Sequence, residues 1–171
     1  MVEAHLLYYI CKMFRILGLI LVAGLMLFAT VSCQGEKLLK LTNQEEQIDS
    51  YIKKEFPDNE VIRLEGANRV IITPGIGPKA AAGDSIWFFY EAYLFSGSPA
   101  GMFWRDSANV MLGSSHLVEG LNRGIEGMSL GEHSIILFSA KYGFYDKNNG
   151  LVPSMSALMY NVLLTGIKKN N

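Results

Sequence analysis

The sequence is poor in the residues that carry covalent and metal chemistry. It contains two cysteines, Cys11 and Cys33, and three histidines in 171 residues. Disulfide frameworks need paired cysteines, and zinc sites need closely spaced cysteine and histidine ligands. His116 and His133 have neither that spacing nor a neighbouring cysteine. We therefore predict no metal site, and no disulfide in the region after Cys33.

The sequence also lacks an excess of charge of either sign. The net charge is −1, from 15 basic and 16 acidic residues, so the chain has no strong field for nucleic acid or an anionic membrane. No pair of acidic residues stands out for acid–base catalysis. We predict no nucleic-acid partner.

One long hydrophobic run is present, near the N-terminus. Residues 13–33 read MFRILGLILVAGLMLFATVSC, with Arg15 before the run and small residues before Cys33. The run is short for a membrane span and has no charged flank behind it, which favours a signal peptide. The cysteine after ATVS resembles a bacterial lipobox. We predict a lipoprotein-type signal peptide at residues 1–32 and lipid on Cys33. The domain would then be anchored to a membrane of the bacterial cell envelope, on the periplasmic or outer side.

Alternatives to this N-terminus are an uncleaved anchor and an ordinary signal peptide. Met13 is a candidate true start, because residues 1–12 precede an otherwise complete signal. Cleavage before Cys33 would remove Glu3, Lys12 and Arg15 and shift the net charge from −1 to −2.

Residues 33–59 are predicted to form a lipidated polar tether followed by a helix. Thr42 and Glu45 form a capping box at its start, and Pro57 follows its end. Apolar residues recur along one side, at Ile48, Ile52 and Phe56.

From residue 60 on, short β-rich runs dominate, and one helical pattern is inserted late. The runs are VIRLE, RVIIT, SIWFFYEAYLF, MFWRDS, NVML, HSIILFSA and ALMYNVLLTGI. The helical pattern places apolar side chains at Leu117, Leu121, Ile125 and Met128. This order predicts an α+β domain in which a curved antiparallel sheet wraps around one short helix, with the extra helix at the N-terminus.

Two short motifs have simpler explanations than catalysis. GMSLG around Ser129 matches a nucleophile elbow, but it follows a helix and precedes a strand, the reverse of the order that an elbow needs. Gly75 to Ala80 matches G-x-G-x-x-A, but two prolines and a following strand leave no room for the helix that would bind a pyrophosphate. Both are predicted to be turns.

Aromatic residues are concentrated in one strand. Side chains alternate along a strand, so Trp87 and Phe89 share one face, while Phe88 and Tyr90 share the other. A sheet that is apolar on both faces needs a cover on each, or an apolar pocket on one. Most of these residues are expected to be core.

Three segments together resemble the FKBP-type peptidyl-prolyl isomerase family. PGIGPKAAAGDSIWFFYEAYLFSG resembles its entry segment, and VMLGSSHLVEGLNRGIEGMSLGEHSIILFS resembles its core signature without a gap. GLVPSMSALMYNVLLTGI resembles its last loop and strand. The resemblance runs from about Gly66 to Lys168 and implies an FKBP-like domain over residues 60–171.

Carried over by position, the resemblance implies a proline-binding pocket. Its lining would be Tyr90, Phe103, Leu117, Val118, Leu121, Phe144 and Tyr160. Leu121 replaces the usual tryptophan floor. Trp104 occupies the place of an acid, with Asp106 as the nearest carboxylate, and the segment from Asp106 to Val110 is shorter than in the family.

The late tyrosine of the family, whose hydroxyl binds the substrate carbonyl, has two possible counterparts. Ungapped alignment puts Phe144 there, whereas a two-residue shift puts Tyr142 there. The sequence alone leaves both open.

The implied activity is cis–trans isomerisation of proline-containing polypeptide segments, assisting the folding of envelope proteins. It needs no cofactor; a backbone N–H near Val118 and the Tyr142 hydroxyl would hold the substrate. Alternatives are a weak or inactive FKBP-like module that binds a peptide or protein, and a purely structural lipoprotein with a filled pocket.

Overall fold

The computed structural model describes residue 13 and residues 34–170. The chain divides into two compact units, Met1–Leu39 and Lys40–Asn171. In the first unit, residues 34–39 are helical. The predicted signal peptide (apart from Met13) and Cys33 lie outside the described residues. Among the described ones, no helix has the length and apolar character needed to cross a membrane.

The second unit begins with helical residues 40–55, called here the N-terminal helix. The predicted polar tether and capping box are wrong, because residues 34–41 are helical and Thr42 therefore lies inside a helix. Glu, Lys and Leu, which dominate that segment, are strong helix formers and outweigh the capping signal. The predicted apolar side is confirmed at Ile48 and Ile52, which are fully buried.

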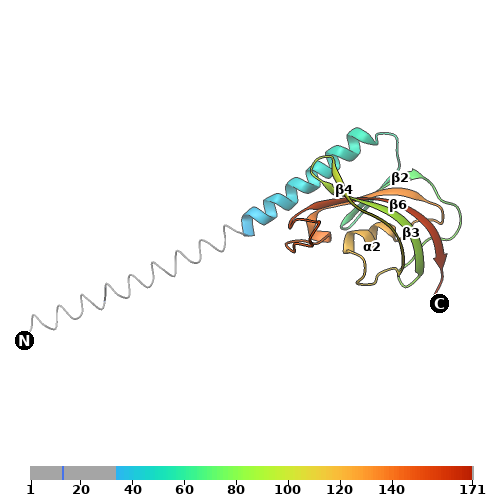
Figure 1. Ribbon diagram of the computed structural model, residues 1–171. Coiled ribbons are helices and arrows are strands. Elements are labelled where there is room, and N and C mark those ends of the chain that lie inside the picture. The colour runs from blue at the N-terminus through green and yellow to red at the C-terminus, as the bar shows by residue number, and fades with distance from the viewer. Residues whose placement is uncertain (1–12, 14–33, 171) are drawn as a thin grey trace, which may run out of the picture. The chain divides into compact units, whose positions relative to one another are not determined.

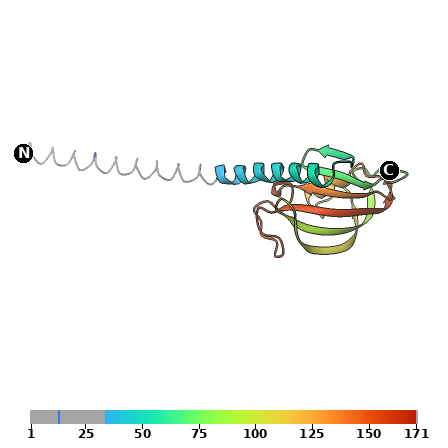
Figure 2. The same cartoon turned by 90° about the horizontal axis from the view of Figure 1, so that it is seen from above.

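A six-stranded sheet forms the body of the second unit (Figure 1). The strands are β1 (Val61–Leu64), β2 (Ala67–Thr73), β3 (Ser85–Phe95), β4 (Pro99–Met111), β5 (His133–Phe138) and β6 (Ala157–Lys168). They are all antiparallel to their neighbours, in the order β1-β2-β5-β6-β3-β4. The long strands curve, as Figure 2 shows from above.

Strand β4 differs from the sequence prediction. Two separate runs, MFWRDS and NVML, were expected, but one continuous strand pairs with β3 from Pro99 to Met111. It lies at the edge of the sheet. Polar side chains such as Ser107 and Asn109 interrupt the apolar pattern there without interrupting the backbone pairing.

The two faces of the sheet carry two separate cores. On the concave face, Phe88 and Leu158 pack with the short helix α2 (Glu119–Ile125). On the opposite face, Leu137 and Met159 pack with the N-terminal helix (Figure 1). That helix covers part of its face, and Phe89 on the same face remains 55% exposed. The α+β architecture predicted from the sequence is confirmed.

Helix α2 lies against the sheet through two glycines. A Cβ at Gly120 would lie 2.3 Å from Phe138 Cγ, and one at Gly124 would lie 2.3 Å from Ile136 Cγ2. Both distances are far inside van der Waals contact. The glycines therefore set how deep the helix lies on the concave face.

A buried ion pair ties the end of α2 to the sheet. Arg69 Nη1 donates to the carbonyl oxygens of Gly124 (2.9 Å) and Glu126 (2.8 Å). Arg69 Nε lies 3.4 Å from Glu132 Oε1, with side-chain exposures of 4% and 5%. The Ser129 amide donates to Glu132 Oε2 at 2.9 Å. Ser129 thus belongs to a helix-to-strand corner, as predicted, and not to a nucleophile elbow.

Candidate functional site

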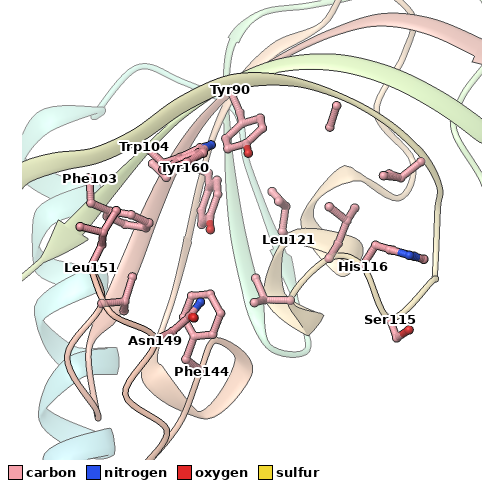
Figure 3. A pocket seen from close by; sticks show the side chains of 16 residues that line it. Tyr90, Phe103, Trp104, Ser115, His116, Leu121, Phe144, Asn149, Leu151 and Tyr160 are labelled. Atoms are coloured by element: carbon pink, nitrogen blue, oxygen red, sulfur yellow. The ribbon is translucent and has the colours of Figure 1, made fainter.

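A cavity of about 690 Å³ opens on the concave side of the sheet. Strands β3 and β4, the start of α2 and the loop after the short helix η1 (Ala140–Tyr142) form its walls (Figure 3). Such a volume is typical of small-molecule sites, which span roughly 300–1,000 Å³. The lining is mainly apolar and aromatic, with few polar groups.

Stacked aromatic rings form the back of the cavity. The Tyr160 ring stacks on Phe138 at 5.7 Å between centroids, and lies 5.9 Å from the Tyr90 ring. Burial raises the pKa of the Tyr160 hydroxyl well above its usual range, so this residue stays neutral throughout the physiological range. These contacts hold two tyrosines of the cavity in a fixed arrangement.

Tyr90 presents its hydroxyl toward the cavity, beside the indole nitrogen of Trp104 (Figure 3). The pKa of Tyr90 is raised by desolvation and by the negative charge of Asp106, and the hydrogen bond with Trp104 opposes these effects. An indole N–H only donates. Trp104 can therefore act on the Tyr90 oxygen only as a donor, which leaves the proton of the Tyr90 hydroxyl for another acceptor.

The floor and rim come from α2 and the segment before it. Leu121 lies on the first turn of α2, at the bottom of the cavity. The Asn122 side chain accepts from the Gly113 amide at 2.9 Å and donates to Ser114 O at 3.0 Å and Leu117 O at 3.2 Å. It thereby fixes the loop that supplies one rim. Sequence reasoning did not identify this role of Asn122.

The sequence model of the FKBP-type peptidyl-prolyl cis-trans isomerase family matches residues 77–165, more than half of the chain. The chain belongs to this family. A curated relative, FK506-binding protein 1 of Aspergillus oryzae, is 32% identical over 114 residues, covering 60% of this chain and 98% of the relative. FK506-binding protein 1 of Yarrowia lipolytica is 30% identical over 103 residues, covering 56% and 93%.

Solved structures agree on the fold. The N-terminal domain of FKBP42 from Arabidopsis thaliana superposes with a TM-score of 0.58 at 24% identity, covering 66% of this chain and 94% of that one. A multi-domain immunophilin from Arabidopsis thaliana gives a TM-score of 0.60 at 21% identity, covering 67% of this chain and 47% of that one. The FKBP-like fold inferred from the sequence is therefore confirmed.

The structure brings all seven residues of the predicted pocket into one cavity of the FKBP domain. They are Tyr90, Phe103, Leu117, Val118, Leu121, Phe144 and Tyr160. Val118 precedes α2 in extended conformation. Among the described residues, its amide N–H donates to no protein acceptor. That donor is available to a bound molecule.

The structure places Phe144 in the cavity and Tyr142 outside it. The Tyr142 ring packs instead beside Gly66, with Lys141 Nζ 4.9 Å and Arg123 Cζ 5.5 Å from the ring centre. The placement of Tyr142 in the pocket is therefore corrected. Helix η1 turns the chain at residues 140–142, so the next side chain to reach the cavity is that of Phe144.

Asp106 pairs with Tyr90 across β3 and β4, but it is exposed and does not line the cavity. Its Oδ1 accepts from the Ser107 amide at 2.7 Å. Asp106 affects the pKa of Tyr90 only through its negative charge, whereas Trp104 acts on the Tyr90 hydroxyl directly. The side chain beside Tyr90 is thus the indole of Trp104, a hydrogen-bond donor, and not the carboxylate of Asp106.

Several lining residues were not singled out from the sequence for this cavity. They are Ala92, Ala108, Val110, Ser115, His116, Asn149, Leu151 and Val152. Most lie in loops or on the edge strand, where no pattern marks a cavity. No cluster of three or more potential metal-binding side chains occurs among the residues that the structure describes.

Proposed function

We propose that this chain catalyses cis–trans isomerisation of X–Pro bonds by binding the prolyl residue in the concave cavity. The observation that carries the proposal is the convergence of the seven predicted pocket residues on one apolar, aromatic cavity. The substrates would be extended, proline-containing segments of polypeptides. No cofactor is required.

Catalysis would come from the apolar environment. Rotation about the amide faces a barrier of about 18–20 kcal/mol. The twisted amide is less polar than the planar one, so an apolar cavity favours the twisted state relative to water. The Val118 N–H would bind a substrate carbonyl. The Tyr90 hydroxyl would provide a second hydrogen-bond donor. Phe144 has no hydroxyl and provides none.

The test is a protease-coupled isomerisation assay on residues 34–171. We expect wild type to accelerate isomerisation and Tyr90→Ala to lose about tenfold or more, equivalent to ~1.4 kcal/mol of transition-state stabilisation. Phe89→Ala is the matched control, because Phe89 lies next to Tyr90 on β3 but faces away from the cavity. Equal rates for wild type and Tyr90→Ala would contradict the proposal.

A second candidate is a binding module with weak or no turnover. Phe144 favours it, because this aromatic residue lines the cavity without a hydroxyl for the substrate carbonyl. Peptide binding by folded wild type without acceleration would support this candidate over the enzyme.

We further propose that lipid on Cys33 anchors the domain in the bacterial cell envelope, where it would assist protein folding. The support is the residue 13–33 pattern; the relatives described above are fungal proteins. In a bacterial host fed an alkyne fatty acid, wild type and Cys11→Ala are expected to be labelled and Cys33→Ala is not. Label on Cys33→Ala would contradict the anchor.

A further inference from the structure

Gln44 is a buried polar residue on the N-terminal helix, outside the region that matches the family. Only 7% of its surface is exposed. Its Nε2 donates to Met155 O at 2.9 Å, and its Oε1 accepts from the Ala140 amide at 3.0 Å. One amide side chain thus joins the helix to two backbone groups distant in sequence.

These two partners are the ends of the loop that forms one wall of the cavity. Between Ala140 and Met155, this loop supplies four lining residues: Phe144, Asn149, Leu151 and Val152. Backbone hydrogen bonds join Ala140, Tyr145 and Met155, which together form the neck of this loop. The Tyr145 amide donates to Ala140 O (2.9 Å), and the Met155 amide donates to Tyr145 O (2.6 Å). The pale cyan helix and this loop appear together at the left of Figure 3.

The neck needs outside support. Tyr145 and Met155 have φ angles of 52° and 56°, in the left-handed region that non-glycine residues rarely adopt. Such conformations persist where the surroundings hold them. Ala140 is fully buried, so water does not readily replace the bond from Gln44, and an unmade bond there is costly.

We propose that Gln44 is a positioning residue that holds the loop 140–155 in its binding arrangement, making the N-terminal helix part of the peptide-binding apparatus. This inference rests on the proposed function of the cavity. Without the two bonds, the loop would occupy its binding arrangement for a smaller fraction of the time. Apparent affinity falls in proportion to that fraction.

The experiment compares full-length wild type, Gln44→Met and Gln47→Met in detergent. Methionine keeps the helix propensity and similar length but removes both bonds. Gln47 is exposed on the same helix and is the matched control. For the probe peptide Ala-Leu-Pro-Phe, we expect Gln44→Met to raise Kd, and KM where turnover is measurable, about tenfold, with kcat at saturation unchanged. Amide exchange at Ala140 and Met155 should speed up by a similar factor.

A second variant changes only the donor to Met155. Gln44→Glu keeps an acceptor for the Ala140 amide, but its other carboxylate oxygen would face the Met155 carbonyl oxygen at a buried position, so we expect an effect at least as large as that of Gln44→Met. Wild-type Kd and loop exchange in a folded Gln44→Met would overturn the proposal. If wild type binds no peptide, the proposed function fails; loop exchange then still decides whether Gln44 holds the loop.

Discussion

Arg69→Met is expected to lower the free energy of unfolding by about 3–5 kcal/mol, because it leaves one member of a buried ion pair uncompensated. The substitution also removes the donors to the carbonyls of Gly124 and Glu126 at the end of α2. Glu132 would then remain 95% buried without its cation. Urea denaturation followed by circular dichroism measures the change.

The control for this prediction is Arg63→Met. Arg63 Nη1 pairs with Asp49 Oδ1 at 2.6 Å, but both side chains are exposed, at 43% and 52%. Surface pairs contribute about 0–1 kcal/mol, so little change is expected. Equal losses for the two variants would show that burial does not set the energy of the Arg69 pair.

Gly120→Ala is expected to destabilise the domain by about 1–3 kcal/mol, the usual range for overpacking a filled core. The new Cβ would meet the Phe138 ring at 2.3 Å. That ring is buried and stacked on Tyr160, so it cannot move without disturbing the cavity. Weaker binding of a proline peptide should therefore accompany the lower thermal midpoint.

Gly35→Ala is the matched control, because Gly35 is also helical but has no atom within 4 Å of an added Cβ. Alanine there should be neutral or stabilise by about 0.5–1 kcal/mol. A Gly120→Ala variant as stable as wild type would show that α2 does not lie as close to the sheet as described.

Apolar spacing and turn residues were sufficient for the α+β fold, because they carry that information locally, whereas the seven cavity residues were implied by the resemblance to the FKBP-type family. The sequence could not choose between Tyr142 and Phe144, since both are aromatic and lie two residues apart in a loop. The roles of Trp104 and Gln44 were also inaccessible. Each depends on a partner that only the folded chain brings near, namely Tyr90 and the neck of the loop.

Strand β6 has a consequence for how the protein is made. It is the last element in the sequence, yet it lies in the middle of the sheet, between β5 and β3. Until the ribosome has released Ala157–Lys168, the β1-β2-β5 and β3-β4 halves have no common partner, and Tyr160 is missing from the cavity. Unpaired strand edges promote aggregation. A nascent chain that stalls before β6 is made would therefore expose the unpaired edges of β5 and β3.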